Sequence, residues 1–150
     1  LGEMFGCQRY GYQPDIITSA KGLTSGYSPL GAVLASDRLM EPFLAERTAF
    51  AHGITFGGHP VSCAVALANL DLFEQEDVLG HVRRHAGEFE AMLGRVRDAC
   101  GIVGDIRGDG YFWALELVTD RATKGEFTSE QAEQLIRGFL SPRLFEEGLA

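Results

Sequence analysis

A short apolar run that ends in a lysine constrains this chain most. Residues 16–20 (IITSA) have the length and composition of a buried strand, and residues 22–31 (GLTSGYSPLG) are rich in turn formers. Lys21 stands between them, so a strand is predicted to deliver its amine to the mouth of a glycine-rich loop. Such a place suits a lysine that forms a Schiff base with a carbonyl, although a strand-end lysine that points into water is the ordinary alternative.

A second segment, residues 52–64, has the pattern of an anion-binding turn. Thr55 is followed closely by two glycines, and Pro60 suits the first position of a helix, where its missing N–H costs nothing. Glycines let a backbone approach a ligand closely, and free N–H groups at a helix start favour an anion such as phosphate. An ordinary loop that leads into a helix gives the same pattern. The segment is therefore a candidate phosphate-binding site only when it is taken together with Lys21.

Taken together, residues 14–32 and residues 55–68 resemble the class III aminotransferases, and the resemblance covers the whole chain. These are pyridoxal-phosphate enzymes of the aspartate-aminotransferase fold, fold type I. The resemblance implies an α/β protein with a mostly parallel sheet and helices on both faces. The hydrophobic pattern changes from wholly buried to amphipathic near residues 76–80. With the resemblance, this change assigns residues 1–75 to the end of the large cofactor-binding domain and residues 76–150 to the start of a small α+β domain, both truncated.

The same resemblance implies roles for three residues. Lys21 takes the place of the lysine that forms the Schiff base with the cofactor. Thr55 takes the place of a phosphate ligand that reaches the cofactor of the partner subunit, and the main-chain N–H of Ile54 assists it. No metal is implied. Residues 24–27 (TSGY) stand where mutases and acetylornithine aminotransferases tend to have three glycines, so the loop is more similar to the omega-amino-acid–pyruvate branch.

The implied enzyme moves an amino group from an amine or omega-amino acid donor to a keto acid such as pyruvate. It is expected to be a cytoplasmic homodimer with shared active sites. Another reaction of the same cofactor, such as that of a mutase or racemase, remains open, as does a non-catalytic α/β module. The resemblance also places the acid for the pyridine nitrogen, the first phosphate loop and a carboxylate-binding arginine outside residues 1–150, so this excerpt alone is expected to be inactive.

Composition excludes several other classes. With 150 residues and 45% hydrophobic content, the chain can bury a sizeable core, and its net charge of −8 argues against a nucleic-acid surface. No apolar stretch reaches the roughly 18 residues of a membrane span, and no signal peptide is apparent. The three cysteines lack metal or disulfide spacing and fit a reducing compartment, and the four histidines do not make a metal set.

Periodicity and capping residues predict the remaining elements. These are a buried strand over 32–35, a helix from Ser36 or Asp37 to about 45, a buried helix over 60–73, an amphipathic helix over 78–96, a hairpin over 102–118 that turns at 108–110, and a last helix that begins at Thr128 or Ser129 and is kinked or ended by Pro142.

Overall fold

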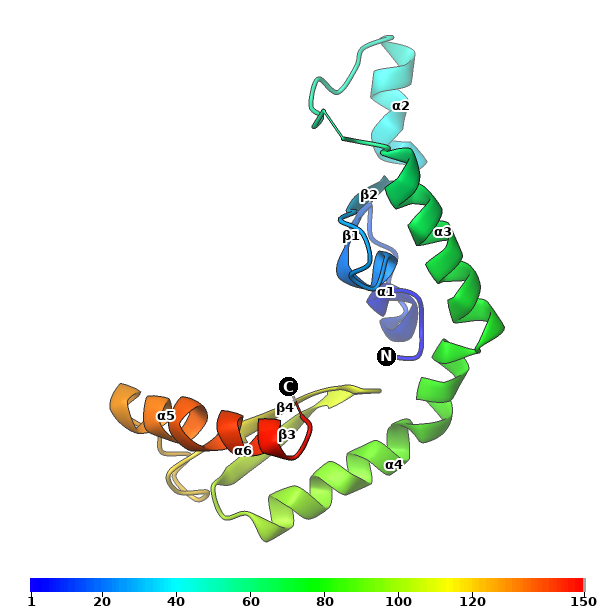
Figure 1. The fold of residues 1–150 in the computed structure, drawn as a ribbon. Helices are drawn as coiled ribbons and strands as arrows, with labels where there is room; N and C mark the ends of the chain where they lie inside the picture. Colours follow the sequence, from blue (N-terminus) through cyan, green and yellow to red (C-terminus); the bar gives the residue numbers. More distant parts are fainter. Residues whose placement is uncertain (150) are drawn as a thin grey trace. The chain divides into compact units, whose positions relative to one another are not determined.

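The computed structural model describes residues 1–149 (Figure 1). The chain forms two compact units, Leu1–Arg84 and a second unit that begins at His85. The division falls inside the helix α4 (Val78–Ala99). The assignment of residues 1–75 and 76–150 to two domains of a longer protein stays a prediction.

The first unit contains a strand pair, three further helices and a short turn of 3₁₀ helix. In chain order they are α1 (Gly6–Tyr10), β1 (Ile16–Ser19), the 3₁₀ turn η1 (Lys21–Leu23), β2 (Ala32–Ala35), α2 (Asp37–Ala45) and α3 (Pro60–Gln75).

Strands β1 and β2 form where the sequence predicts them, but they pair with each other. The pairing is antiparallel, with Ile17 opposite Leu34 and Ser19 opposite Ala32. The connection between them, residues 20–31, contains the 3₁₀ turn η1 and doubles back, as a connection between neighbouring antiparallel strands does. The prediction that both strands are buried is wrong for the described chain, because Val33 is 72% exposed. None of the eight residues of the strand pair is buried.

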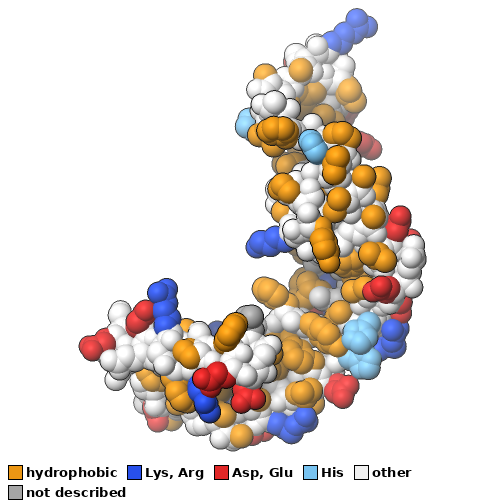
Figure 2. Space-filling model, viewed as in Figure 1, with side chains coloured by type: hydrophobic (Ala, Val, Ile, Leu, Met, Phe, Trp, Pro, Cys, Tyr) orange, Lys and Arg blue, Asp and Glu red, His pale blue; other side chains and the backbone are white. Residues whose placement is uncertain are grey.

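Helix α3 begins at Pro60, as predicted, and His59 is its N-cap. The buried residues of α3 are Ser62 and Ala66, whereas Leu67 is 64% exposed. The prediction of a wholly buried helix is therefore wrong for the part of the chain described. Apolar residues occupy nearly every face of α3, and Figure 2 shows hydrophobic side chains gathered along it. Helix α3 contacts η1, and most of its other residues are exposed.

The second unit is built on the C-terminal part of α4 and a hairpin of β3 (Val103–Asp109) and β4 (Phe112–Leu117). The hairpin is antiparallel, as predicted. The turn is formed by residues 110–111 in place of the predicted 108–110, because β3 continues to Asp109 and pairs there with Phe112. The rings of Phe89 and Tyr111, 5.2 Å apart between centroids, pack α4 against the hairpin.

The C-terminal helices follow the predicted cap. Thr128 caps α5 (Ser129–Leu135), and its hydroxyl and the side chain of Gln131 form a reciprocal capping box. The chain then passes through a π-helical turn, Ile136–Leu140, into α6 (Ser141–Glu146). Pro142 lies at the start of α6, where its missing N–H is tolerated, and the regular α-helix ends before it.

Among residues 1–149, no helix combines the length and the apolar character needed to cross a bilayer.

Candidate functional site

Lys21 opens the 3₁₀ turn directly after β1. Its backbone is left-handed, with φ of +47°, while Ala20 before it is extended. The turn is closed by the N–H of Leu23, which donates to the carbonyl of Ala20 at 3.0 Å, and by the N–H of Thr24, which donates to the carbonyl of Lys21 at 3.2 Å. A left-handed residue with a Cβ costs about 1–2 kcal/mol, and such strain persists where surrounding contacts impose it. The lysine side chain is exposed.

The loop that follows Lys21, residues 22–31, is called the lysine loop below. A hydrogen bond between two of its own residues stabilises it. Thr24 is 2% exposed, and its hydroxyl donates to the carbonyl of Ser28 at 2.5 Å. Ser25 and Gly26 also have positive φ, at 51° and 80°. The buried hydroxyl of Thr24 therefore satisfies a backbone carbonyl within a loop that has no regular ladder of its own.

Helix α3 holds the same loop from outside at two places. The side-chain amide of Asn69 donates to the carbonyl of Gly22 at 2.9 Å and to that of Leu23 at 3.2 Å. One face of the helix thus fixes the end of the 3₁₀ turn. The motifs in the sequence did not indicate a role for Asn69. An asparagine inside an apolar helix, where it is a poor helix former, was the available signal.

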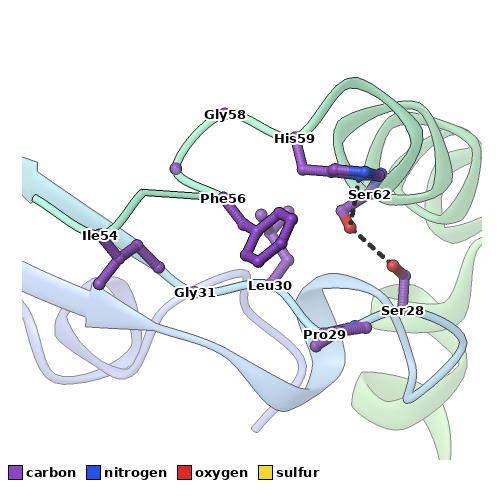
Figure 3. A pocket seen from close by; sticks show the side chains of 10 residues that line it. Ser28, Pro29, Leu30, Gly31, Ile54, Phe56, Gly58, His59 and Ser62 are labelled. Carbon is purple, nitrogen blue, oxygen red and sulfur yellow. Dashed lines mark hydrogen bonds between the residues drawn. The ribbon is translucent and has the colours of Figure 1, made fainter.

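The second place is the first turn of α3 (Figure 3). The hydroxyl oxygens of Ser62 and Ser28 lie 2.8 Å apart and share a hydrogen bond. Ser62 is 5% exposed, and its N–H donates to Nδ1 of the capping His59 at 3.3 Å. The helix start is therefore linked to the far end of the lysine loop. The sequence motifs did not indicate this contact between Ser28 and Ser62.

A hollow of about 560 Å³ lies between the lysine loop and the segment that leads into α3 (Figure 3). Its described lining includes Ile54 but neither Lys21 nor Thr55. The full lining is Ser28, Pro29, Leu30, Gly31, Ile54, Phe56, Gly57, Gly58, His59 and Ser62.

Thr55 starts a turn over residues 55–58 and is exposed, as is Ile54 before it. The N–H of Gly57 donates to the carbonyl of Ile54 at 3.4 Å, and Gly58 has φ of +69°. The glycines thus make the tight entry to the helix that the pattern indicates. The binding roles of Lys21, Ile54 and Thr55 remain predictions.

The family model for "Aminotransferase class-III" matches residues 1–139. The chain belongs to the class III aminotransferases. A curated relative, the "Probable aminotransferase Rv3329" of Mycobacterium tuberculosis, is 58% identical over 149 residues. That alignment covers 99% of this chain and 32% of the relative. This chain therefore spans about a third of the length of that relative.

Solved structures of this family show the same fold. An (S)-enantioselective omega-transaminase from Thermomicrobium roseum matches with a TM-score of 0.80 and 43% identity, over 86% of this chain and 29% of that one. A PLP-bound aminotransferase mutant from Vibrio fluvialis matches with a TM-score of 0.77 and 41% identity, over 86% and 29%. The predicted fold, the α/β fold type I of these transaminases, is confirmed, and so is the family's cofactor, pyridoxal phosphate.

The donors present suit that cofactor. The exposed amine of Lys21, on a turn held by hydrogen bonds, is a group that can form a Schiff base with the aldehyde of the cofactor. A threonine hydroxyl and exposed backbone at a glycine-rich helix entry are groups that bind phosphate. The described residues therefore fit pyridoxal phosphate.

Proposed function

We propose that the whole protein is an aminotransferase that moves an amino group from an amine or omega-amino acid donor to a keto acid such as pyruvate. The observation that carries this proposal is Lys21, held with left-handed backbone at the end of β1 in a turn that α3 clamps. The solved relatives named as omega-transaminases support the donor class. The loop residues 24–27 (TSGY) support the same branch.

In this proposal Lys21 has two tasks. Its Nζ would hold the cofactor, and as a free amine it would carry a proton to and from the donor's carbon. The bound cofactor would supply an electron sink for the negative charge that develops on that carbon. The turn keeps Nζ in place for both tasks, so that proximity and orientation lower the barrier.

Thr55 and Ile54 would bind the cofactor phosphate, through the threonine hydroxyl and the isoleucine N–H. We place this contact across a homodimer, in the partner's site. Two observations support that arrangement: Ile54 is 74% exposed and Phe56 is 78% exposed, as suits residues that meet another subunit. A cytoplasmic location belongs to the same proposal, and the cysteines among residues 1–149 are unpaired.

Borohydride reduction of the full-length holoenzyme tests the role of Lys21. Reduction fixes the cofactor to the amine that holds it, so peptide mapping should find the adduct on Lys21. An adduct on Lys124, or on no lysine, would overturn the assignment. A screen of amine donors and keto-acid acceptors then separates an aminotransferase from a mutase or racemase, which needs no separate acceptor.

Thr55→Ala tests the shared site. The change should weaken cofactor binding by about 1.5–3 kcal/mol, the worth of a hydrogen bond to a charged group. Mixing it with Lys21→Ala under subunit exchange puts both lesions into one site of each heterodimer and leaves the other site whole. Random exchange should then restore about a quarter of wild-type activity at limiting cofactor. No recovery, with exchange verified, would show that Thr55 serves its own subunit.

A further inference from the structure

The turn that Lys21 opens ends on two carbonyls that a distant side chain satisfies. The last carbonyls of a short helical turn have no partner within the turn itself. Those of Gly22 and Leu23 receive the amide of Asn69 at 2.9 and 3.2 Å, across 47 and 46 residues of chain. Asn69 thus acts as a C-terminal cap contributed by another element, α3.

The chemistry of this contact requires a donor with two hydrogens. Nδ2 of an asparagine has two, enough for one hydrogen bond to each carbonyl oxygen. An aspartate at this place would put a negatively charged acceptor next to the carbonyl oxygens of Gly22 and Leu23, and it has no hydrogen to donate to them. An alanine would leave both carbonyls without this partner.

The contact also bears on the strain at Lys21. Left-handed backbone is unfavourable for a residue with a Cβ, so a free turn would convert in part to the right-handed form. Asn69 holds the carbonyls one and two residues after Lys21, and Ser62 holds Ser28 at the far end of the loop. The loop is therefore fixed to one helix directly after Lys21 and again at Ser28, and these two places flank the positive-φ residues Ser25 and Gly26.

We propose that Asn69 is a positioning residue for Lys21: its amide keeps the turn in the form that places Nζ for the cofactor. This inference rests on the proposed function of Lys21. Removing the clamp would displace Nζ in most molecules, and a misplacement of about 1 Å can cost roughly 10²-fold in rate.

The test compares Asn69→Ala, Asn69→Asp and Gln75→Ala in the full-length protein. Gln75→Ala is the matched control, because it removes the same amide from the exposed last residue of α3. In the apoprotein, hydrogen exchange across residues 21–28 should be about five- to tenfold faster in Asn69→Ala than in the control. In the holoenzyme, kcat should fall about 5- to 50-fold while the KM of the donor stays within about twofold.

In Asn69→Asp, kcat should fall at least as far as in Asn69→Ala. Where Asn69→Ala does not fold, Asn69→Ser replaces it, since its single short donor cannot span both carbonyls. Exchange and kcat equal to those of Gln75→Ala would overturn the inference in either variant.

Borohydride mapping in parallel separates this failure from failure of the proposed function. If the adduct maps to Lys21 while the Asn69 variants match the control, the inference alone falls. If the adduct maps elsewhere, the proposed function falls, and the positioning role falls with it.

Discussion

The lysine loop in the first unit and the hairpin in the second are both fixed by side chains that donate to backbone carbonyls, but the donors differ. Neutral groups hold the lysine loop: the amide of Asn69 donates to two of its carbonyls, and the hydroxyl of Ser62 shares a hydrogen bond with the hydroxyl of Ser28. In the second unit the guanidinium of Arg121 donates to the carbonyls of Val103 and Cys100, both at 2.8 Å, and to that of Arg97. A positive group suits the negative end of helix α4.

This difference separates two uses of the same kind of hydrogen bond. The neutral contacts keep a strained loop in place and leave the amine of Lys21 exposed. The charged contact closes a helix end and joins it to β3. Substitutions in the first region should therefore change the chemistry more than the stability, and substitutions in the second region should do the reverse.

Lys21→Ala should produce the largest effect. Turnover in the full-length enzyme should fall by roughly 10³-fold or more, because the change removes the amine that holds the cofactor and moves the proton. The free energy of unfolding of the apoprotein should change by less than about 0.5 kcal/mol, since the side chain is exposed. Steady-state rates and urea titrations measure the two quantities. Retained turnover in Lys21→Ala would contradict the statement that substitutions in the first region change the chemistry more than the stability.

Arg121→Ala should have the opposite profile. It removes hydrogen bonds from a charged donor to three carbonyls and should lower the free energy of unfolding by about 1–2 kcal/mol. The kcat of the folded enzyme should stay within about twofold. Arg143→Ala is the control, because its ion pair with Glu146 is exposed and worth little. A loss of kcat without a loss of stability would contradict the assignment of Arg121 to the scaffold.

Thr128→Ala should give a smaller loss in the second unit. The change removes the hydroxyl that caps α5 and should cost about 1 kcal/mol. Hydrogen exchange over residues 129–135 should accelerate, whereas Ser129→Ala, which leaves the cap in place, should not show this. Equal exchange in the two variants would mean that the capping box does not stabilise α5.

Acid sensitivity should show the smallest effect and should be common to both units. The hydrogen bond from Arg38 lowers the pKa of Asp15, with help from Ser36, and that from Arg107 lowers the pKa of Asp105. A lowered pKa adds stability above the unfolded value of about 3.9, and this stability is lost as the pH falls through the folded value.

Unfolding followed from pH 6 to pH 2 checks this sign. Arg38→Ala should make the acid-side decline shallower, because Asp15 then titrates nearer its ordinary pKa. Arg107→Ala should do the same for Asp105. The declines should be small, since both carboxylates are exposed. A steeper decline in either variant would reverse the assigned direction.

Local chemistry in the sequence was enough to predict most elements. The apolar runs gave β1 and β2, Pro60 marked the first residue of α3, and Thr128 marked the cap of α5. These signals depend on residues within a few positions of one another, so no knowledge of packing is needed. The sequence also led to the family and its cofactor, through residues that stand together in two short segments.

The tertiary structure decided which strands pair, which faces are covered and which distant residues meet. The pairing of β1 with β2, the burial of Thr24 and the exposure of most of α3 could not be read from periodicity, because apolar residues on every face do not say which face is covered. The clamp of Asn69 joins groups 46 and 47 residues apart. Such a contact depends on how α3 packs against the loop, and so does the left-handed backbone of Lys21. The sequence determined that a lysine follows a strand, whereas only the packing of α3 determined how that lysine is held.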